Sequence, residues 1–149
     1  MTSESFRCGW VAFIGAPNVG KSTMINAILG QKVAIVTPKP QTTRNQITGI
    51  LSEEDCQIIF FDTPGIHGRK GRMNRFLLQT AWQSLQASDV IVLIIDAQMF
   101  LKQRSMFDEE LRRMKDPLSQ SSSPLIICLN KIDLVGDKKL LLPLMEHMH

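Results

Sequence analysis

The stretch Gly15-Ala16-Pro17-Asn18-Val19-Gly20-Lys21-Ser22 follows a short apolar run and precedes a segment with helical periodicity. It matches the pattern G-x-x-x-x-G-K-[ST], whose glycines let backbone N–H groups converge on phosphate oxygens at a helix N-terminus. Lys21 then supplies a positive charge to the β- and γ-phosphates, and Ser22 offers a hydroxyl to Mg²⁺. With Thr23, these residues form a predicted phosphate-binding site. The alternative is a plain strand-turn-helix connection.

Short β-rich runs alternate with longer amphipathic stretches on both sides of this loop, as in α/β domains with a mainly parallel sheet. Strands are expected at residues 10–15, 47–51, 57–62, 89–96 and 125–129, and helices at 21–29, 73–87, 105–115 and from 138 onward, the last interrupted by Pro143. Ser105 and Asp108 resemble a capping box, and 116–124 reads as a solvated loop. Because polar residues separate 47–51 from 57–62, these strands are expected to form an antiparallel hairpin at the sheet edge.

A second motif, Asp62-Thr63-Pro64-Gly65, ends a predicted strand. In that position Asp62 is expected to hold Mg²⁺ through its water shell, as the corresponding aspartate does in P-loop proteins. A glycine at 65 lets a backbone N–H approach the γ-phosphate closely, so loss of that phosphate can release the loop. Taken alone, the four residues are also an ordinary turn sequence.

A third motif, Asn130-Lys131-Ile132-Asp133, follows a buried strand and bears on the choice of base. A carboxylate such as Asp133 can accept hydrogen bonds from both N1–H and the N2 amino group of guanine, whereas adenine offers no such donor pair. The alternative is a charged helix start. Because the three motifs occur in this order, the four residues are predicted to bind guanine.

Composition narrows the class of protein further. With 149 residues and 44% hydrophobic composition, the chain is expected to form one domain. Its three cysteines lack C-x-x-C spacing, so neither a zinc site nor a disulfide framework is expected. No apolar run approaches the roughly 20 residues that span a bilayer, and no signal-peptide pattern is present, so a cytoplasmic location is expected. A net charge of +3 is too small to argue for nucleic acid by itself.

The three motifs match translation-factor-like GTPases, and Gln41-Thr42-Thr43-Arg44 together with Asp62-Thr63-Pro64-Gly65-Ile66-His67 resembles the Era family of bacterial GTPases. The resemblance covers nearly the whole chain. It implies that residues 41–45 form switch I, with Thr43, or alternatively Thr42, as the Mg²⁺ ligand that senses the γ-phosphate. It makes Lys21, Thr43 and Gly65 the expected catalytic residues and adds Ile66 to the phosphate-binding set.

Hydrolysis is expected to differ from that of Ras-like enzymes, which place a glutamine directly after the second motif. Ile66 has no donor or acceptor with which to orient water. His67 is a candidate base, with an exposed loop histidine as the alternative. By resemblance, Asn18 is the candidate ligand of a K⁺ ion that would supply charge in place of an arginine; its alternative role is to stabilise the loop turn.

The resemblance also implies the extent of the domain. Residues 1–149 are expected to form a G domain with a three-layer P-loop NTPase fold, truncated before its last strand and helix. The Ser-Ala motif behind guanine and the KH-type RNA-binding domain of the family are not found after Asp133. An exposed sheet edge, weakened GTP affinity and limited solubility are therefore expected. The family's partners, small-subunit ribosomal RNA and the ribosomal subunit, would bind through the absent domain, and some members associate peripherally with membranes.

The expected activity is hydrolysis of GTP to GDP and phosphate, with a switch between the two nucleotide states, in small ribosomal subunit assembly. Three alternatives stay open. The first is a guanine-nucleotide module that binds without hydrolysis, and the second is another ribosome-assembly or tRNA-modification GTPase. The third is an ATP-using P-loop protein, which the third motif opposes. Basic residues at 69–75 are a candidate contact for RNA phosphates, or a solvated loop.

Overall fold

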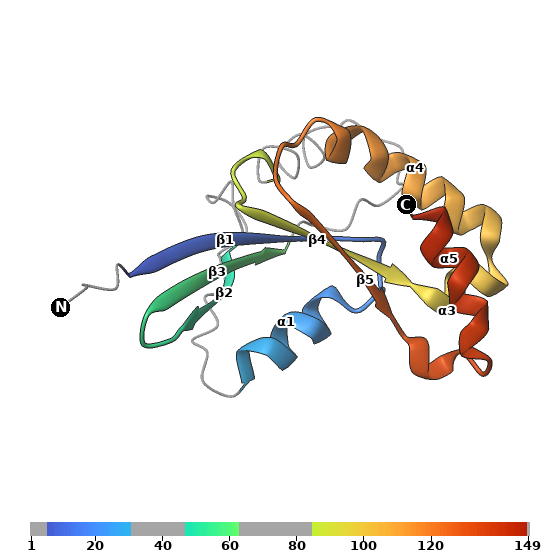
Figure 1. Cartoon of the computed structure of the whole chain (residues 1–149), viewed down its shortest axis with the longest axis horizontal. Helices are drawn as coiled ribbons and strands as arrows, with labels where there is room; N and C mark the ends of the chain where they lie inside the picture. The colour runs from blue at the N-terminus through green and yellow to red at the C-terminus, as the bar shows by residue number, and fades with distance from the viewer. Residues whose placement is uncertain (1–5, 31–46, 63–84, 149) are drawn as a thin grey trace.

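Five strands form a single sheet in the computed structural model, which describes residues 6–30, 47–62 and 85–148. The strands lie in the order β2-β3-β1-β4-β5. Helix α1 covers one face of the sheet, while α4 and α5 lie on the other (Figure 1). The expected three-layer α/β arrangement is therefore confirmed for the described residues.

The pairing of the strands places a topological switch at the centre of the sheet. β1 (Arg7–Ile14) pairs in parallel with β3 (Cys56–Asp62) on one side and with β4 (Val90–Asp96) on the other. β5 (Leu125–Asn130) continues the parallel part beyond β4. In open parallel sheets, ligands bind outside the carboxyl ends of the strands at such a switch. The carboxyl end of β1 is the start of the phosphate loop.

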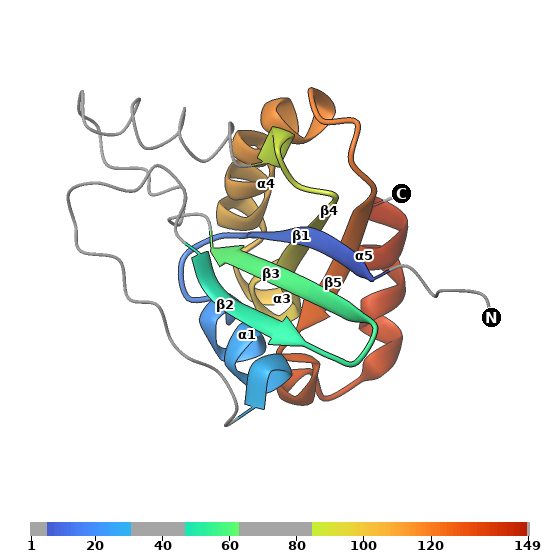
Figure 2. The same cartoon turned by 90° about the vertical axis from the view of Figure 1, so that its left-hand side faces the viewer.

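β2 (Ile47–Ser52) is the one antiparallel strand of the described sheet, and it pairs with β3 (Figure 2). This is the hairpin expected from the polar residues between the two apolar runs. The backbone of Glu53 donates to the carbonyl of Cys56 across the turn, at 2.9 Å. β2 is therefore one of the two edge strands of the described sheet.

The helices begin and end at residues that the local chemistry explains. α1 spans Lys21–Leu29 between two glycines with positive φ, Gly20 and Gly30, which suit the ends of a helix. α3 (Ala97–Lys102) is followed by α4 (Arg104–Ser119) and, after β5, by the 3₁₀ segments Ile132–Leu134 and Lys138–Leu140. α5 (Leu141–His147) follows directly.

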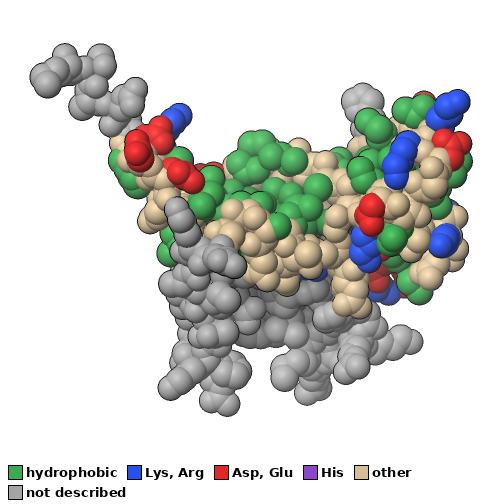
Figure 3. Space-filling view, turned by 90° about the horizontal axis from the view of Figure 1, so that it is seen from below, with side chains coloured by type: hydrophobic (Ala, Val, Ile, Leu, Met, Phe, Trp, Pro, Cys, Tyr) green, Lys and Arg blue, Asp and Glu red, His purple; other side chains and the backbone are tan. Residues whose placement is uncertain are grey.

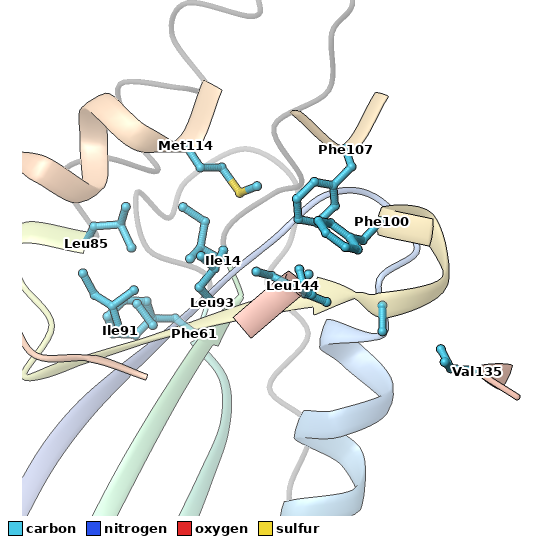
Figure 4. Close-up of a cluster of buried hydrophobic side chains, with 13 residues drawn as sticks. Ile14, Phe61, Leu85, Ile91, Leu93, Phe100, Phe107, Met114, Val135 and Leu144 are labelled. Carbon is cyan, nitrogen blue, oxygen red and sulfur yellow. The ribbon is translucent and has the colours of Figure 1, made fainter. Parts of the chain in front are cut away.

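The core has two parts because successive residues of β1 point to opposite faces of the sheet. Phe13 packs with Ile25 and Leu29 of α1 on one face. Ala12 and Ile14 point to the other face, where the side chains come from α3, α4 and α5 (Figure 4). The buried members there include Leu93, Phe100, Phe107, Met114 and Leu144. The sheet is therefore anchored on both sides of the strand that carries the phosphate loop.

Hydrophobic side chains also gather on the surface of the α1 layer (Figure 3). Ile28 of α1 is 44% exposed and Ile126 of β5 is 55% exposed. Cys128 lies two residues after Ile126, hence on the same face, and its Sγ is 3.9 Å from Met24 Sδ of α1. β5 is the second edge strand of the described sheet.

Several expectations about the helices were wrong. α3 was not predicted, and α4 continues to Ser119 where a loop was expected from Asp116. Pro117 is buried within this helix, so packing outweighs the loss of its backbone N–H. Ser105 and Asp108 do not form a capping box, because the N-cap is Gln103 and Asp108 accepts from Arg104 instead.

The C-terminal helix also differs from the expectation. Pro143 does not interrupt α5, since it lies in the first turn, where a backbone N–H has no intrahelical partner. Most of the helix expected at 73–87 lies outside the described residues. Within the part of the chain that the structure describes, no helix combines the length and hydrophobicity needed to cross a membrane.

Candidate nucleotide-binding site

The phosphate loop connects β1 to α1 and has the backbone that its sequence requires. Gly20 caps α1 at φ 102°, and no side chain caps this end of the helix. Asn18 also has a positive φ, 61°, a conformation that asparagine tolerates better than most residues. At Gly15 a Cβ atom would lie 2.7 Å from the carbonyl oxygen of Ile94 in β4. Glycine is therefore required at 15 for close packing and at 20 for the turn into the helix.

Lys21 folds back over the loop that precedes it. Its side chain is buried, and Nζ donates to the carbonyl oxygens of Gly15 and Ala16 at 2.9 and 3.0 Å. An ammonium group buried in a protein requires such partners. The charge of Lys21 is thus held inside the curve of the loop, where the sequence places the phosphates.

The third motif touches the first directly. The side-chain amide of Asn130 donates from Nδ2 to the carbonyl oxygen of Val19 at 2.7 Å. A Cβ atom on Gly20 would overlap that same amide group. Asn130, the last residue of β5, was predicted to bind guanine. In the structure its side chain fixes the end of β5 to the phosphate loop.

Lys131 and Asp133 follow Asn130 on a tightly turned loop. Lys131 has φ 58° and ψ 29°, a left-handed conformation that costs a non-glycine residue about 1–2 kcal/mol. Its Nζ lies 2.7 Å from Oδ2 of Asp96, the last residue of β4. Asp133 is exposed in the 3₁₀ segment that follows. Its carboxylate is accessible to a base placed against this loop.

Asp96 is the residue of this arrangement that sequence reasoning missed. It pairs with Asn130 in the β4–β5 register, which brings it next to Lys131. The available signal was a carboxylate at the end of a buried apolar strand, where side chains at the carboxyl edge of a parallel sheet converge. From the sequence, Asp96 was interpreted only as the last residue of the strand 89–96.

The second motif begins at the same edge of the sheet. β3 ends at Asp62, whose backbone lies opposite Phe13 of β1, two residues before Gly15. Ser22 and Thr23 lie in the exposed first turn of α1. The remaining predicted residues of this part, Thr63, Pro64, Gly65 and Ile66, lie outside the described residues. So do Thr42, Thr43 and His67.

A cavity of about 360 Å³ lies beside the phosphate loop. Its wall includes Ala16, Pro17 and Asn18 of the loop, together with Asp96 and Lys131. Residues of α3, including Gln98 and Lys102, and of α4, including Met106 and Glu110, form the rest of the wall. The loop that is expected to hold the phosphates and the ion pair behind the guanine motif therefore border one space.

Residues 10–131 of the chain match the family described as 50S ribosome-binding GTPase. The chain is 51% identical over 148 residues to GTPase Era of Nitratidesulfovibrio vulgaris strain DP4, covering 99% of this chain and 48% of that protein. It is 54% identical over 144 residues to GTPase Era of the Miyazaki F strain, covering 97% and 47%. The chain therefore spans about half the length of these relatives.

A solved structure is similar over the same extent. The crystal structure of Era in complex with MgGDPNP and nucleotides 1506–1542 of 16S ribosomal RNA aligns with a TM-score of 0.73 and 39% sequence identity. The alignment covers 97% of this chain and 47% of that one. It agrees with the fold described above.

The sheet order, the phosphate loop and the family match define a P-loop GTPase, and the chain belongs to the family of 50S ribosome-binding GTPases. Within that family it resembles the G domain of the proteins named GTPase Era, as the sequence predicted.

Proposed function

We propose that this chain binds guanine nucleotides at the carboxyl edge of its sheet and hydrolyses GTP to GDP and phosphate. The observation that carries the proposal is the hydrogen bond from Asn130 to the carbonyl of Val19. It joins the base-reading motif to the phosphate loop, so one nucleotide can reach both. Lys21 inside the loop and the exposed carboxylate of Asp133 supply the two recognition chemistries, for phosphate and for guanine.

Phosphate binding is assigned to the loop residues 15–20 with Lys21, Ser22 and Thr23. It is also assigned to the second motif and the residue after it, residues 62–66. The fit to a phosphate chain rests on the backbone, because the absence of a Cβ at Gly15 and Gly20 lets the loop pack closely against Ile94 and Asn130, and the N-terminus of α1 faces the loop. Guanine is assigned to the residues 130–133.

Mg²⁺ is assigned to Ser22, Asp62 and Thr43, with Thr42 as the alternative to Thr43. A hydroxyl and a carboxylate are the oxygen ligands that Mg²⁺ prefers, and the β1–β3 register brings the end of β3 to the edge that carries the phosphate loop. When bound, the ion would neutralise charge on the phosphates. The MgGDPNP of the similar Era structure supports this assignment.

Hydrolysis without a glutamine after the second motif needs another source of positive charge near the γ-phosphate. We assign Asn18 as a ligand of K⁺, because its side chain is exposed on the phosphate loop and borders the cavity. Lys21, Thr43 and Gly65 are the proposed catalytic residues. Stabilisation of the loop turn alone is the competing role for Asn18.

In the cell, we infer a role in assembly of the small ribosomal subunit in the bacterial cytoplasm. The similar Era structure contains 16S ribosomal RNA, and the relatives are bacterial. The chain would act as the nucleotide-dependent part of a longer protein. Its partners would respond to the difference between the GTP and GDP states.

Two measurements test the proposal. Titration with fluorescent GDP and ADP analogues is expected to show a clear preference for GDP, and equal affinities would contradict guanine recognition. Single-turnover phosphate release at saturating GTP and Mg²⁺ is expected to be faster in K⁺ than in Na⁺ at equal ionic strength, and Asn18→Ala should remove the difference. Binding with no phosphate release in either salt would favour a module that binds without hydrolysis, as Ile66 suggests.

A further inference from the structure

Asp96 binds two separate parts of the chain through its two carboxylate oxygens. Oδ1 accepts hydrogen bonds from the backbone N–H groups of Gln98 and Met99, at 2.9 and 3.1 Å, and so caps α3. Oδ2 lies 2.7 Å from Nζ of Lys131. The side chain of Asp96 is only 13% exposed. One largely buried carboxylate therefore connects the start of α3 to the loop after β5.

The loop after β5 requires a restraint at this point. Asn130 is already bonded to the phosphate loop, and Asp133 must present its carboxylate three residues later. Between them, Lys131 turns the chain through a left-handed conformation that side chains rarely adopt. The pair with Asp96 holds the far end of the Lys131 side chain and thereby limits the paths that the loop can take.

We propose that Asp96 is a positioning residue for base recognition, which acts on guanine through Lys131 and not by contact with the nucleotide. The inference rests on the proposed function, because it requires a guanine base against residues 130–133. Asp96 fixes Lys131, Lys131 fixes the turn, and the turn places Asp133. The phosphate contacts of Lys21 and the loop do not depend on this chain of contacts.

The substitution Asp96→Asn separates the two roles of the carboxylate. Asparagine caps helices as well as aspartate, so α3 keeps its N-cap while the ion pair with Lys131 is lost. The affinity for GDP is expected to fall about fivefold, as for loss of a partly exposed charge pair. The affinity for ADP should stay unchanged, because ADP uses only the phosphate contacts, so the preference for GDP over ADP falls by the same factor.

Asp108→Asn is the matched control. Asp108 also forms an ion pair, with Arg104, but on the exposed side of α4. It should leave the GDP preference as in the wild type. The two variants should shift the midpoint of thermal unfolding by similar small amounts, so that a change in nucleotide preference is separated from a change in stability.

A double-mutant cycle with Lys131→Met tests whether Asp96 acts through Lys131, since methionine keeps an apolar stem without the charge. Asp96→Asn is expected to have no further effect on GDP affinity in the Lys131→Met background. An equal loss in both backgrounds would overturn the inference, as would a wild-type preference for GDP in Asp96→Asn. A wild-type chain that binds GDP no better than ADP would instead overturn the proposed function.

Discussion

Nδ2 of Asn130 lies 2.7 Å from the carbonyl oxygen of Val19, although 111 residues separate the two along the chain. The contact crosses from the last residue of β5 to the phosphate loop after β1, with β4 between the two strands. Because the asparagine donates to a backbone carbonyl, the contact depends on its amide and not on the identity of residue 19. The bond thus makes the two motifs one structural unit.

Asn130→Ala tests this unit. Removing the donor leaves the Val19 carbonyl without this partner, at a cost of about 1–3 kcal/mol. The affinity for both GDP and ADP is expected to fall about tenfold or more, because the phosphate loop itself is loosened. Binding of fluorescent analogues measures the effect. The control is Asn26→Ala on the exposed side of α1, and equal affinities in both variants would argue against the role of the contact.

Gly20→Ala should destabilise the chain. The new Cβ would overlap the amide of Asn130, and the residue has φ 102°, which alanine rarely adopts. Strain of this kind costs about 1–3 kcal/mol. At about 2–4 °C per kcal/mol, the midpoint of thermal unfolding should fall by about 5 °C. Gly136→Ala, where a Cβ meets nothing within 4 Å, should shift it far less; similar shifts would refute the packing argument.

Asp133→Asn is expected to shift the base preference from guanine toward xanthine nucleotides. The side chain is exposed in the described structure, so the substitution should leave the fold intact. An amide can donate to the carbonyl that replaces the amino group of guanine, whereas a carboxylate cannot. Competition between GTP and XTP for the wild type and the variant gives the result. A variant with the full GTP preference of the wild type would show that Asp133 does not read the base.

Leu144→Ala tests how α5 is held to the sheet. Leu144 is 0% exposed among the side chains of the larger core. A buried Leu→Ala change costs about 2–5 kcal/mol, so the midpoint of thermal unfolding should fall by roughly 5–15 °C. Leu142→Ala is the matched control, because Leu142 is on the same helix and 58% exposed. If both variants lose the same stability, α5 does not pack as described.

The sequence predicted those elements whose signals are local. α1 was placed at its observed bounds because a helical pattern stops at Gly30. The strands were located from apolar runs of strand length, although β1 begins at Arg7, three residues before the expected start. α3 was missed because six residues are too few to show helical periodicity. The end of α4 was missed because Pro117 is a local helix breaker, and its burial in the folded chain explains why it is tolerated.

The site was predictable to a similar extent. Motifs predicted the phosphate loop and the residues 130–133, since their expected chemistry depends on residues adjacent in sequence. Asp96 could not be found in this way. Its contact with Lys131 spans 35 residues and exists only because β4 and β5 pair in a register that places Asp96 opposite Asn130.

The folded-back position of Lys21 has a consequence for which ligands the loop can hold. The ammonium already has hydrogen bonds to two carbonyl groups, so it lies in place before a nucleotide arrives, and little side-chain entropy remains to be lost on binding. A phosphate bound as proposed would meet a preformed positive centre. A nucleoside monophosphate, whose single phosphate lies nearest the ribose, lacks the groups that would reach this centre. The loop should therefore discriminate by the length of the phosphate chain, independently of the base.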